Sequence, residues 1–247
     1  MKLYFGCAQW GYGSWVGSIY PSSAGPKDFL GFYADTFNAV ELNPTYHQDI
    51  ARSAITRWKN CVGRKFKFCP KFPKIISHDK RLENAEADTA RFVKTVLAFE
   101  DNLGCCFMQL PPYLPPAYLS ILNVYLQSLP EGFQTAIELR PDWLRDDELC
   151  SSALNILKQN RAPLVIVDST ESRPYLNKTK LTASTAFVRF IAYGHPTDYE
   201  RMSDWVNLIS NWKQKGLAEL YFFLHFPEEE SSADFVKWVI GEFDPFF

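Results

Sequence analysis

The sequence predicts an α/β protein that folds as a single (β/α)8 TIM-type barrel with parallel strands. The chain has 247 residues, close to the size of about 250 residues that is typical of such barrels. Eight short hydrophobic runs alternate with helix-length amphipathic segments, as repeated βα units require. With 47% hydrophobic and 16% aromatic residues the chain can bury one large core. We therefore expect one domain that spans residues 1–247.

The hydrophobic runs have the length and composition of strands that are buried on both faces. Parallel strands covered by helices are almost continuously apolar and do not alternate between apolar and polar residues. The runs fit that description and are each four to six residues long. In chain order they are Leu3 to Ala8, Ala39 to Leu42, Phe66 to Cys69, Cys105 to Leu110, Thr135 to Leu139, Leu164 to Val167, Ala186 to Ile191, and Leu220 to Leu224.

Helices are predicted in seven of the segments that follow these runs. Acids in the first turn, as in Asp146-Asp147-Glu148, and capping hydroxyls such as those of Ser231 and Ser232 support their starts. The sixth connection, Thr170 to Ser184, is polar and interrupted by proline, so we expect an irregular crossover there. The predicted helices are Asp28 to Phe37, Ile50 to Asn60, Ala85 to Leu103, Pro116 to Ser128, Asp146 to Asn160, Glu200 to Lys215, and Ser231 to Phe243.

An open, doubly wound sheet is the alternative to a closed barrel. Such sheets often carry the dinucleotide motif G-x-G-x-x-G after the first strand. Here Gly11, Gly13 and Gly17 follow the first run without that spacing and are interleaved with aromatic residues, which would block the approach of a pyrophosphate. The sequence therefore favours the barrel over a dinucleotide-binding fold.

The charge balance bears on the partners of the protein. The chain has 26 lysine and arginine residues against 28 aspartate and glutamate residues, a formal charge of -2, so no global basic field attracts a polyanion. Nucleic acid is disfavoured but not excluded, because a local basic patch is compatible with this balance. The sequence contains neither a signal-peptide pattern nor an apolar span of about 18 residues, so we expect a cytosolic, cytoplasmic protein with no membrane partner.

The cysteines are expected to be buried, reduced thiols. They show no C-x-x-C spacing, and most of them lie within apolar runs, where a free cysteine behaves as a small hydrophobic residue. A reactive Cys7 near the end of the first run, or an adventitious disulfide, is the alternative. The six residues are Cys7, Cys61, Cys69, Cys105, Cys106 and Cys150.

Large polar and aromatic residues end, or closely follow, the hydrophobic runs. In a barrel these positions converge on the carboxyl ends of the strands, where barrel enzymes have their active sites. Charged side chains in buried strands need partners, so they form either a structural ion-pair network or a site. The candidate catalytic residues are Glu41, Glu138, Asp168 and His225. The candidate substrate-binding residues are Gln9, Trp10, Asn43, Lys71, His78, Gln109, Arg140, Trp143 and Arg189.

Spacing and residue type suggest what these side chains do. Glu138 and Arg140 are two residues apart on one strand and therefore face the same way, as do Glu41 and Asn43. Lys71 is the lysine of its segment that we expect to point inward, where it could bind an anion or transfer a proton. Each of the candidate histidines is a titrating group, a metal ligand or a structural residue.

A series of short motifs in and after the hydrophobic runs matches those of a known family. In chain order they are Gly6-Cys7-Ala8-Gln9-Trp10, a segment from Phe32 to Tyr46, Phe66 to Pro73 with Ile76-Ser77-His78, Gln109-Leu110-Pro111-Pro112, Ile137 to Trp143, Val167-Asp168-Ser169, Val188 to Ile191, and Leu224-His225-x-Pro227. In these motifs the chain resembles the YecE-like family, also called domain of unknown function 72. The resemblance covers nearly the whole chain in order and implies a TIM barrel without a characterised activity. In the commoner branch of that family the eighth strand ends in an Asn-rich segment that this chain lacks.

Three functions are compatible with these residues. The first is a cytosolic enzyme that uses acid/base residues at the barrel mouth on a small polar substrate, either anionic or sugar-like. The second is a metal-assisted enzyme of the isomerase or endonuclease type. The third is a non-enzymatic module that binds a metabolite or nucleic acid. The sequence requires no cofactor, leaves a divalent metal open, and does not determine the oligomeric state.

Overall fold

The computed structural model describes residues 1–112, 114–178, 180–226 and 233–247. Eight strands lie in this part of the chain, and every strand pair is parallel. They form a six-stranded sheet of order β3-β2-β1-β8-β7-β6 and a two-stranded sheet, β4-β5. The strands are β1 (Lys2–Cys7), β2 (Ala39–Leu42), β3 (Lys67–Pro70), β4 (Cys106–Gln109), β5 (Thr135–Glu138), β6 (Val165–Asp168), β7 (Thr185–Ile191) and β8 (Glu219–His225).

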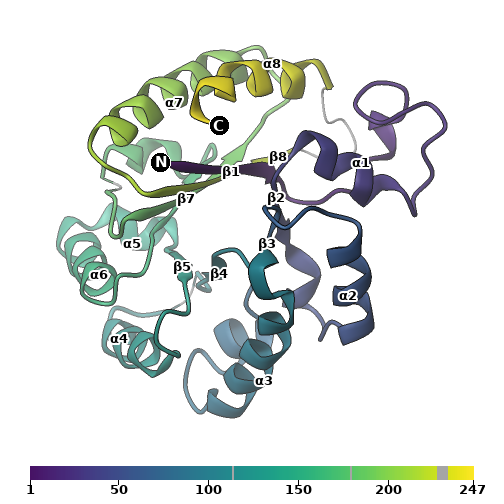
Figure 1. Cartoon of the computed structure of the whole chain (residues 1–247). Coiled ribbons are helices and arrows are strands. Elements are labelled where there is room, and N and C mark those ends of the chain that lie inside the picture. The colour runs from purple at the N-terminus through teal and green to yellow at the C-terminus, as the bar shows by residue number, and fades with distance from the viewer. Residues whose placement is uncertain (113, 179, 227–232) are drawn as a thin grey trace.

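The helices surround the strands (Figure 1). Asp146 begins one of them, α6, with a side-chain oxygen that accepts a hydrogen bond from the Leu149 backbone NH at 2.9 Å, as its acidic first turn predicts. The α-helices are α1 (Phe29–Thr36), α2 (Arg52–Asn60), α3 (Glu86–Val96), α4 (Tyr118–Ser128), α5 (Pro141–Arg145), α6 (Asp147–Gln159), α7 (Thr197–Gln214) and α8 (Ala233–Phe243). Among the described residues between β6 and β7 the one helical element is a 3-10 helix, η5 (Arg173–Lys178), so the irregular sixth crossover is confirmed.

The two sheets meet at seams that consist of isolated bridges. Phe68 bridges Leu103 and Lys71 bridges Phe107 between β3 and β4, and Ile137 bridges Leu164 between β5 and β6. Proline explains part of the first seam. The backbone NH groups of Lys67 and Lys71 donate to β2, so by alternation Pro70 faces β4, and proline has no NH to donate.

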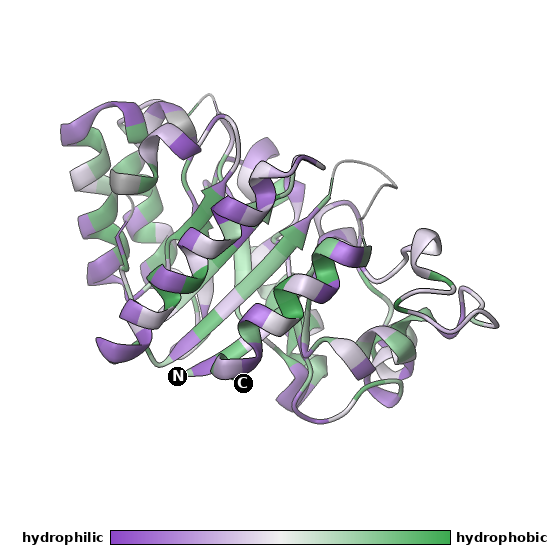
Figure 2. Cartoon of the chain, turned by 90° about the horizontal axis from the view of Figure 1, so that it is seen from above, coloured by the Kyte–Doolittle hydropathy of each residue, from purple (hydrophilic) through white to green (hydrophobic). Residues whose placement is uncertain are grey.

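The strands separate two hydrophobic clusters. Alternate strand residues, such as Val40, Met108 and Ile166, belong to the large cluster that also contains helix residues. The strand residues that point the other way, to the inner side, form a small cluster that contains no helix residues. Its members are Ala39, Cys69, Cys105, Phe107, Ala136, Val165, Phe187, Tyr221 and Phe223. Figure 2 shows the strands mostly hydrophobic and the helices striped with hydrophilic residues, as expected when helices cover only the outer face of the strands.

Most predicted elements are confirmed with boundaries that shift by a few residues. The helix predicted from Ala85 to Leu103 is an exception: α3 ends at Val96, and the rest of the segment is a 3-10 helix, Leu97–Asn102, interrupted at Glu100, whose φ is 51°. The short helix α5 was not predicted, because it immediately follows β5 and is only five residues long. The prediction of a single closed barrel sheet is not confirmed, because the hydrogen-bonded ladders between strands are interrupted at the two seams. Ser231, Ser232 and Pro227, on which two expectations rested, lie outside the described residues. In the described part of the chain no helix has the length and hydrophobicity needed to cross a membrane.

Candidate functional site

Six predicted site residues face inward at the carboxyl ends of six strands. Side chains alternate along a strand, so a residue two positions beyond a member of the small inner cluster faces the same way. This rule applies to Glu41 after Ala39, Lys71 after Cys69, Gln109 after Phe107, Glu138 after Ala136, Arg189 after Phe187, and His225 after Phe223. Together with Asn43 and Arg140 we call these residues the strand-end cluster.

Arg189 of β7 links two buried carboxylates across the strand ends. Its Nε lies 2.9 Å from Glu41 Oε1 and its Nη2 lies 3.3 Å from Glu41 Oε2. Its Nη1 donates to Glu138 Oε2 at 2.6 Å. The three side chains come from β7, β2 and β5, and the residues are 9%, 1% and 5% exposed. Charge pairing and hydrogen bonding therefore compensate for their burial.

His225 extends this network from β8. Its Nε2 lies 3.0 Å from Glu41 Oε1, and its side chain is 15% exposed. Asn43 supports the same carboxylate, donating from Nδ2 to Glu41 Oε2 at 3.3 Å and to the Ala8 carbonyl at 3.1 Å. The prediction that Glu41 and Asn43 face the same way is thus confirmed. Glu41 can hold the imidazole in one orientation, as a carboxylate does for a histidine that transfers protons.

Glu138 connects Arg189 to the members of the cluster that follow or end β3, β4 and β5. Its Oε1 accepts a hydrogen bond from Gln109 Nε2 and lies 3.9 Å from Arg140 Nη1. Gln109 Oε1 in turn accepts a hydrogen bond from Lys71 Nζ at 3.1 Å. Glu138 and Arg140 therefore face the same way, as their spacing predicts, and Lys71 points inward as expected.

Burial and neighbouring charges change the acidity of two members of the cluster. Burial acts to raise the pKa of Glu41, but the opposing effects of Arg189 and His225 outweigh it and lower the pKa to about 2. Burial lowers the pKa of Lys71, and the positive charge of Arg189 lowers it further, against the effect of Glu138 and Glu41. Glu41 is therefore a carboxylate at neutral pH, and the ammonium of Lys71 lies in a site that favours proton loss.

His78 and Tyr46 flank Lys71. The Lys71 ammonium lies 4.5 Å from the centroid of the Tyr46 ring, whose edge meets the His78 ring at 5.5 Å between centroids. His78 Nδ1 lies 2.9 Å from Ser77 Oγ. Burial lowers the pKa of His78, and the charges of Lys71 and Arg140 lower it further. His78 therefore borders the strand-end cluster on the side of its cations. The sequence did not indicate that Tyr46 packs on Lys71, because ring orientation depends on the fold.

Asp168 does not join the strand-end cluster. It lies two residues beyond Ile166 of the large outer cluster, so its side chain points outward to α7. Its carboxylate accepts hydrogen bonds from Arg201 Nη2 at 2.8 Å, from Trp205 Nε1 at 2.9 Å and from Arg173 Nη1 at 3.0 Å. Arg201 also pairs with Asp198 at 2.8 Å. We call these five residues the Asp168 cluster.

Three further candidates also lie outside the strand-end network. Gln9 is exposed, and Trp10 meets the ring of Trp58 at 5.4 Å between centroids. Trp143 of α5 is 4% exposed and donates from Nε1 to the Leu114 carbonyl at 3.0 Å, which gives it a packing role. Among the described residues, none of the hydrogen bonds of these side chains reaches the cluster.

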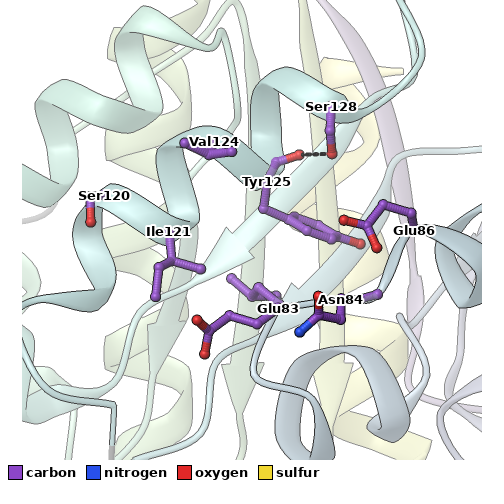
Figure 3. A pocket seen from close by; sticks show the side chains of 10 residues that line it. Glu83, Asn84, Glu86, Ser120, Ile121, Val124, Tyr125 and Ser128 are labelled. Carbon is purple, nitrogen blue, oxygen red and sulfur yellow. Dashed lines mark hydrogen bonds between the residues drawn. The ribbon is translucent and has the colours of Figure 1, made fainter.

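The outer surface carries hollows that are separate from the cluster. One, of about 370 Å³, lies between residues 82–86 and helix α4 and is shown in Figure 3. Glu83, Asn84 and Glu86 line one side of it, and Ile121 and Tyr125 line the other. A second hollow, of about 560 Å³, lies beside α7 and includes Asp168 and Trp205. Neither is lined by a member of the strand-end cluster.

A metal site was one of the options left open by the sequence. Within the described residues no three histidine, cysteine, aspartate or glutamate side chains are grouped so that they could hold a metal ion. The two inward-facing carboxylates, Glu41 and Glu138, are instead both bound by Arg189.

A family model described as "Protein of unknown function DUF72" matches residues 4–244. The chain belongs to the DUF72 family. The UPF0759 protein YecE of Escherichia coli strain K12 is 28% identical over 253 residues, which are 95% of this chain and 90% of that protein.

Solved DUF72 structures are similar in fold. A DUF72 family protein from Thermotoga maritima matches with a TM-score of 0.76 at 19% identity, over 100% of this chain and 99% of the other. One from Enterococcus faecalis matches with a TM-score of 0.73 at 17% identity, over 98% and 94%. The family is one of unknown function, so these matches support the fold, and the function has to be argued from the strand-end cluster.

Proposed function

We propose that this DUF72 protein is a cytosolic acid–base enzyme that acts on a small polar substrate at the strand-end cluster. The observation that carries the proposal is the contact of 3.0 Å between His225 Nε2 and Glu41 Oε1, in which Glu41 is itself bound by Arg189. Apolar residues could fill the carboxyl ends of the strands without the desolvation cost of buried charges, and in barrel enzymes these ends form the active site.

The proposal includes one closed (β/α)8 barrel with the cluster at its mouth. Eight parallel strands, surrounding helices and isolated bridges at both seams support this interpretation. In such a barrel the carboxyl ends of all strands open on the same face, and a substrate held there meets residues from several strands at once. The cytosol is supported by the six free cysteines, all of which lie in the described part of the chain.

His225 is the proton-transfer residue of the proposed reaction. With Nε2 held by Glu41, its Nδ1 has no hydrogen-bond partner among the described residues and is available to a substrate. Glu41 acts as a positioning residue, because its low pKa keeps it ionised and able to stabilise an imidazolium. Arg189 holds Glu41 and Glu138 at a constant separation, and Glu138 orients Gln109 toward the substrate.

A thermal-shift screen followed by turnover measurements tests this function. The probes are sugars, sugar phosphates, carboxylic acids and short oligonucleotides, each with and without divalent metal. A ligand at about 100 times its dissociation constant stabilises by about 2.7 kcal/mol. Turnover of each hit is then followed by proton NMR with wild-type protein and with His225→Asn. We expect this variant to bind the hit and to lose about 100-fold or more in turnover.

His195→Asn is the matched control. His195 is exposed in the loop after β7 and hydrogen-bonds Thr197, so its replacement should leave turnover unchanged. Wild-type turnover by His225→Asn would contradict the proposed role of His225. A shift with oligonucleotides alone, without turnover, would favour a binding module instead of an enzyme. Turnover that is seen only with added metal and is retained by His225→Asn would favour the metal-assisted alternative.

A further inference from the structure

We infer that Lys71 and Arg140 form an oxyanion subsite that holds a carboxylate or phosphate group of the substrate; this rests on the proposed function and narrows its substrate class. The strand-end cluster has two sides. The β2, β7 and β8 side contains Glu41, Arg189 and His225, and the β3 to β5 side contains Lys71, Gln109 and Arg140.

Lys71 is a desolvated cation without a carboxylate partner. Among the described residues its ammonium donates to one acceptor, the neutral amide oxygen of Gln109, although an ammonium has three hydrogens to donate. Two aromatic rings also lie near it, with the Tyr46 and Phe107 ring centroids at 4.5 and 5.9 Å from Nζ. Rings favour a cation but do not neutralise its charge.

Arg140 is equally short of acceptors. Its Nε is buried and has no hydrogen-bond partner among the described residues. Its ion pair with Glu138 is long, at 3.9 Å, because Glu138 already binds Arg189 at 2.6 Å and Gln109. The side chain is 27% exposed, so its guanidinium remains accessible from the open side of the strand ends.

The charges around these two residues do not cancel. Lys71, Arg140 and Arg189 face two carboxylates, Glu41 and Glu138, and both carboxylates bind Arg189. The positive charges act on one another: burial lowers the pKa of Lys71, and Arg189 and Arg140 lower it further, although Glu138 and Glu41 act to raise it. His78, which faces the same side from the segment after β3, has its own pKa lowered by Lys71 and Arg140. A bound anion would supply the missing counter-charge.

The donors match an oxyanion better than a neutral hydroxyl. The planar guanidinium of arginine presents parallel NH groups to two oxygens of one group, and lysine adds a compact point charge. Gln109 lies between the two, since its Oε1 accepts from Lys71 and its Nε2 donates to Glu138, the carboxylate that Arg140 also approaches. The substrate would thus be anchored by its anionic group, with its reacting atoms directed toward His225.

Anion titrations at constant ionic strength test the subsite without any knowledge of the reaction. Inorganic phosphate, sulfate and malonate are titrated into the full chain, with glucose as a neutral probe, and binding is measured by isothermal titration calorimetry and thermal shift. We expect saturable binding of phosphate or malonate and none of glucose. A preference for phosphate identifies a phosphate monoester as the substrate group, and a preference for malonate identifies a carboxylate.

Single variants locate the binding. Lys71→Gln and Arg140→Gln should each raise the dissociation constant of the bound anion by about tenfold or more. Lys74→Gln is the control, because Lys74 belongs to the same segment as Lys71 but is exposed and paired with Asp79 at 3.5 Å. It should bind as the wild type does. Arg140→Lys keeps the positive charge but not the planar guanidinium, so it should bind the anion more tightly than Arg140→Gln and less tightly than the wild type.

The results separate the two proposals. Wild-type affinity in both Lys71→Gln and Arg140→Gln, or no anion binding by the wild type at tens of millimolar, would overturn the oxyanion subsite. Neither result would contradict the proposed role of His225 in proton transfer. His225→Asn should still bind the anion, so retained binding with lost turnover supports both proposals.

Discussion

Two buried carboxylate–arginine clusters lie on opposite sides of the strand layer: the strand-end cluster is on the inner side, and the Asp168 cluster is on the outer side, between β6 and α7. In the Asp168 cluster, a carboxylate that is 0% exposed accepts from Arg201, Trp205 and Arg173. Arg201 also donates to the Asp168 and Ile191 carbonyls, at 3.0 Å each. The Nε of Arg201 is buried and meets no acceptor in the described part of the chain, but its other NH groups are all bound. In the strand-end cluster, by contrast, Lys71 donates to a single neutral amide oxygen, and the ion pair of Arg140 with Glu138 is long, at 3.9 Å.

The difference indicates separate purposes. A buried ion-pair network whose charges are matched is mainly structural, and removing one partner leaves charge that is no longer compensated in a low dielectric. Surplus charge at a partly open site does not stabilise the fold, and proteins tolerate it where a ligand completes the arrangement. We therefore expect substitutions in the Asp168 cluster to affect stability, and those at Lys71 and Arg140 to affect binding.

The largest expected effect is that of Asp168→Ala. This change removes one of the two carboxylates that pair with Arg201, which is 3% exposed, together with the acceptor of the Trp205 indole NH. We expect the free energy of unfolding to fall by about 3–5 kcal/mol. Urea denaturation followed by far-UV circular dichroism measures it. Asp168→Asn keeps the shape and should lose less, whereas a loss of under about 1 kcal/mol in Asp168→Ala would show that the cluster is not structural.

An intermediate effect on the free energy of unfolding is expected when the pH is lowered. Burial raises the pKa of Glu41, but Arg189 and His225 more than offset this and lower it to about 2 in the folded protein, from 4.5. The stabilisation is therefore fully present above pH 4.5 and is lost as the pH falls toward 2. We expect this group to contribute roughly 2–3 kcal/mol to the pH dependence of unfolding.

The measurement for Glu41 is the free energy of unfolding between pH 6 and the acid limit, obtained from urea titrations at each pH. Glu41→Gln should flatten the acid branch of the curve, because the titrating group is gone. Glu200→Gln, on the exposed face of α7, is the control and should leave the branch unchanged. An equally steep branch in Glu41→Gln would mean that other acids carry the effect.

The smallest effect on stability is expected from Lys71→Gln and Arg140→Gln. Each change removes one of several positive charges that repel one another, and the new amide is neutral. The free energy of unfolding should stay within about 0.5 kcal/mol of the wild type or rise by up to about 1 kcal/mol. Losses as large as that of Asp168→Ala would make the two clusters equivalent and would remove the distinction between structural and functional charges.

The sequence predicted much of the site because of one general property of parallel strands. Polar residues that end hydrophobic runs converge in space when the strands are parallel, so Glu41, Lys71, Gln109, Glu138, Arg189 and His225 were selected correctly as neighbours. Asp168 was selected on the same grounds. It turned out to face α7, and Val165-Ile166-Val167 is apolar at every position, so alternation gives no sign of which face is inward.

The partners of Asp168 were also beyond the reach of the sequence. Arg201 and Trp205 are 33 and 37 positions away along the chain, and they read as ordinary members of an amphipathic helix. Trp143 looked like an aromatic residue at the rim, but its indole NH satisfies the Leu114 carbonyl across 29 positions. Such pairings depend on how helices dock on the outer face, which local pattern does not encode.

The sequence by itself determined the alternation of strands and helices, the irregular sixth crossover and the polar character of the strand ends. These features follow from local hydrophobic period, proline and glycine placement, and capping, which act within a few residues. Only the tertiary structure decided which polar residues meet, that the ladders break beside Pro70, and that Lys71 and Arg140 remain short of acceptors. Those outcomes depend on the distances and dielectric surroundings that arise when strands far apart in sequence pack together.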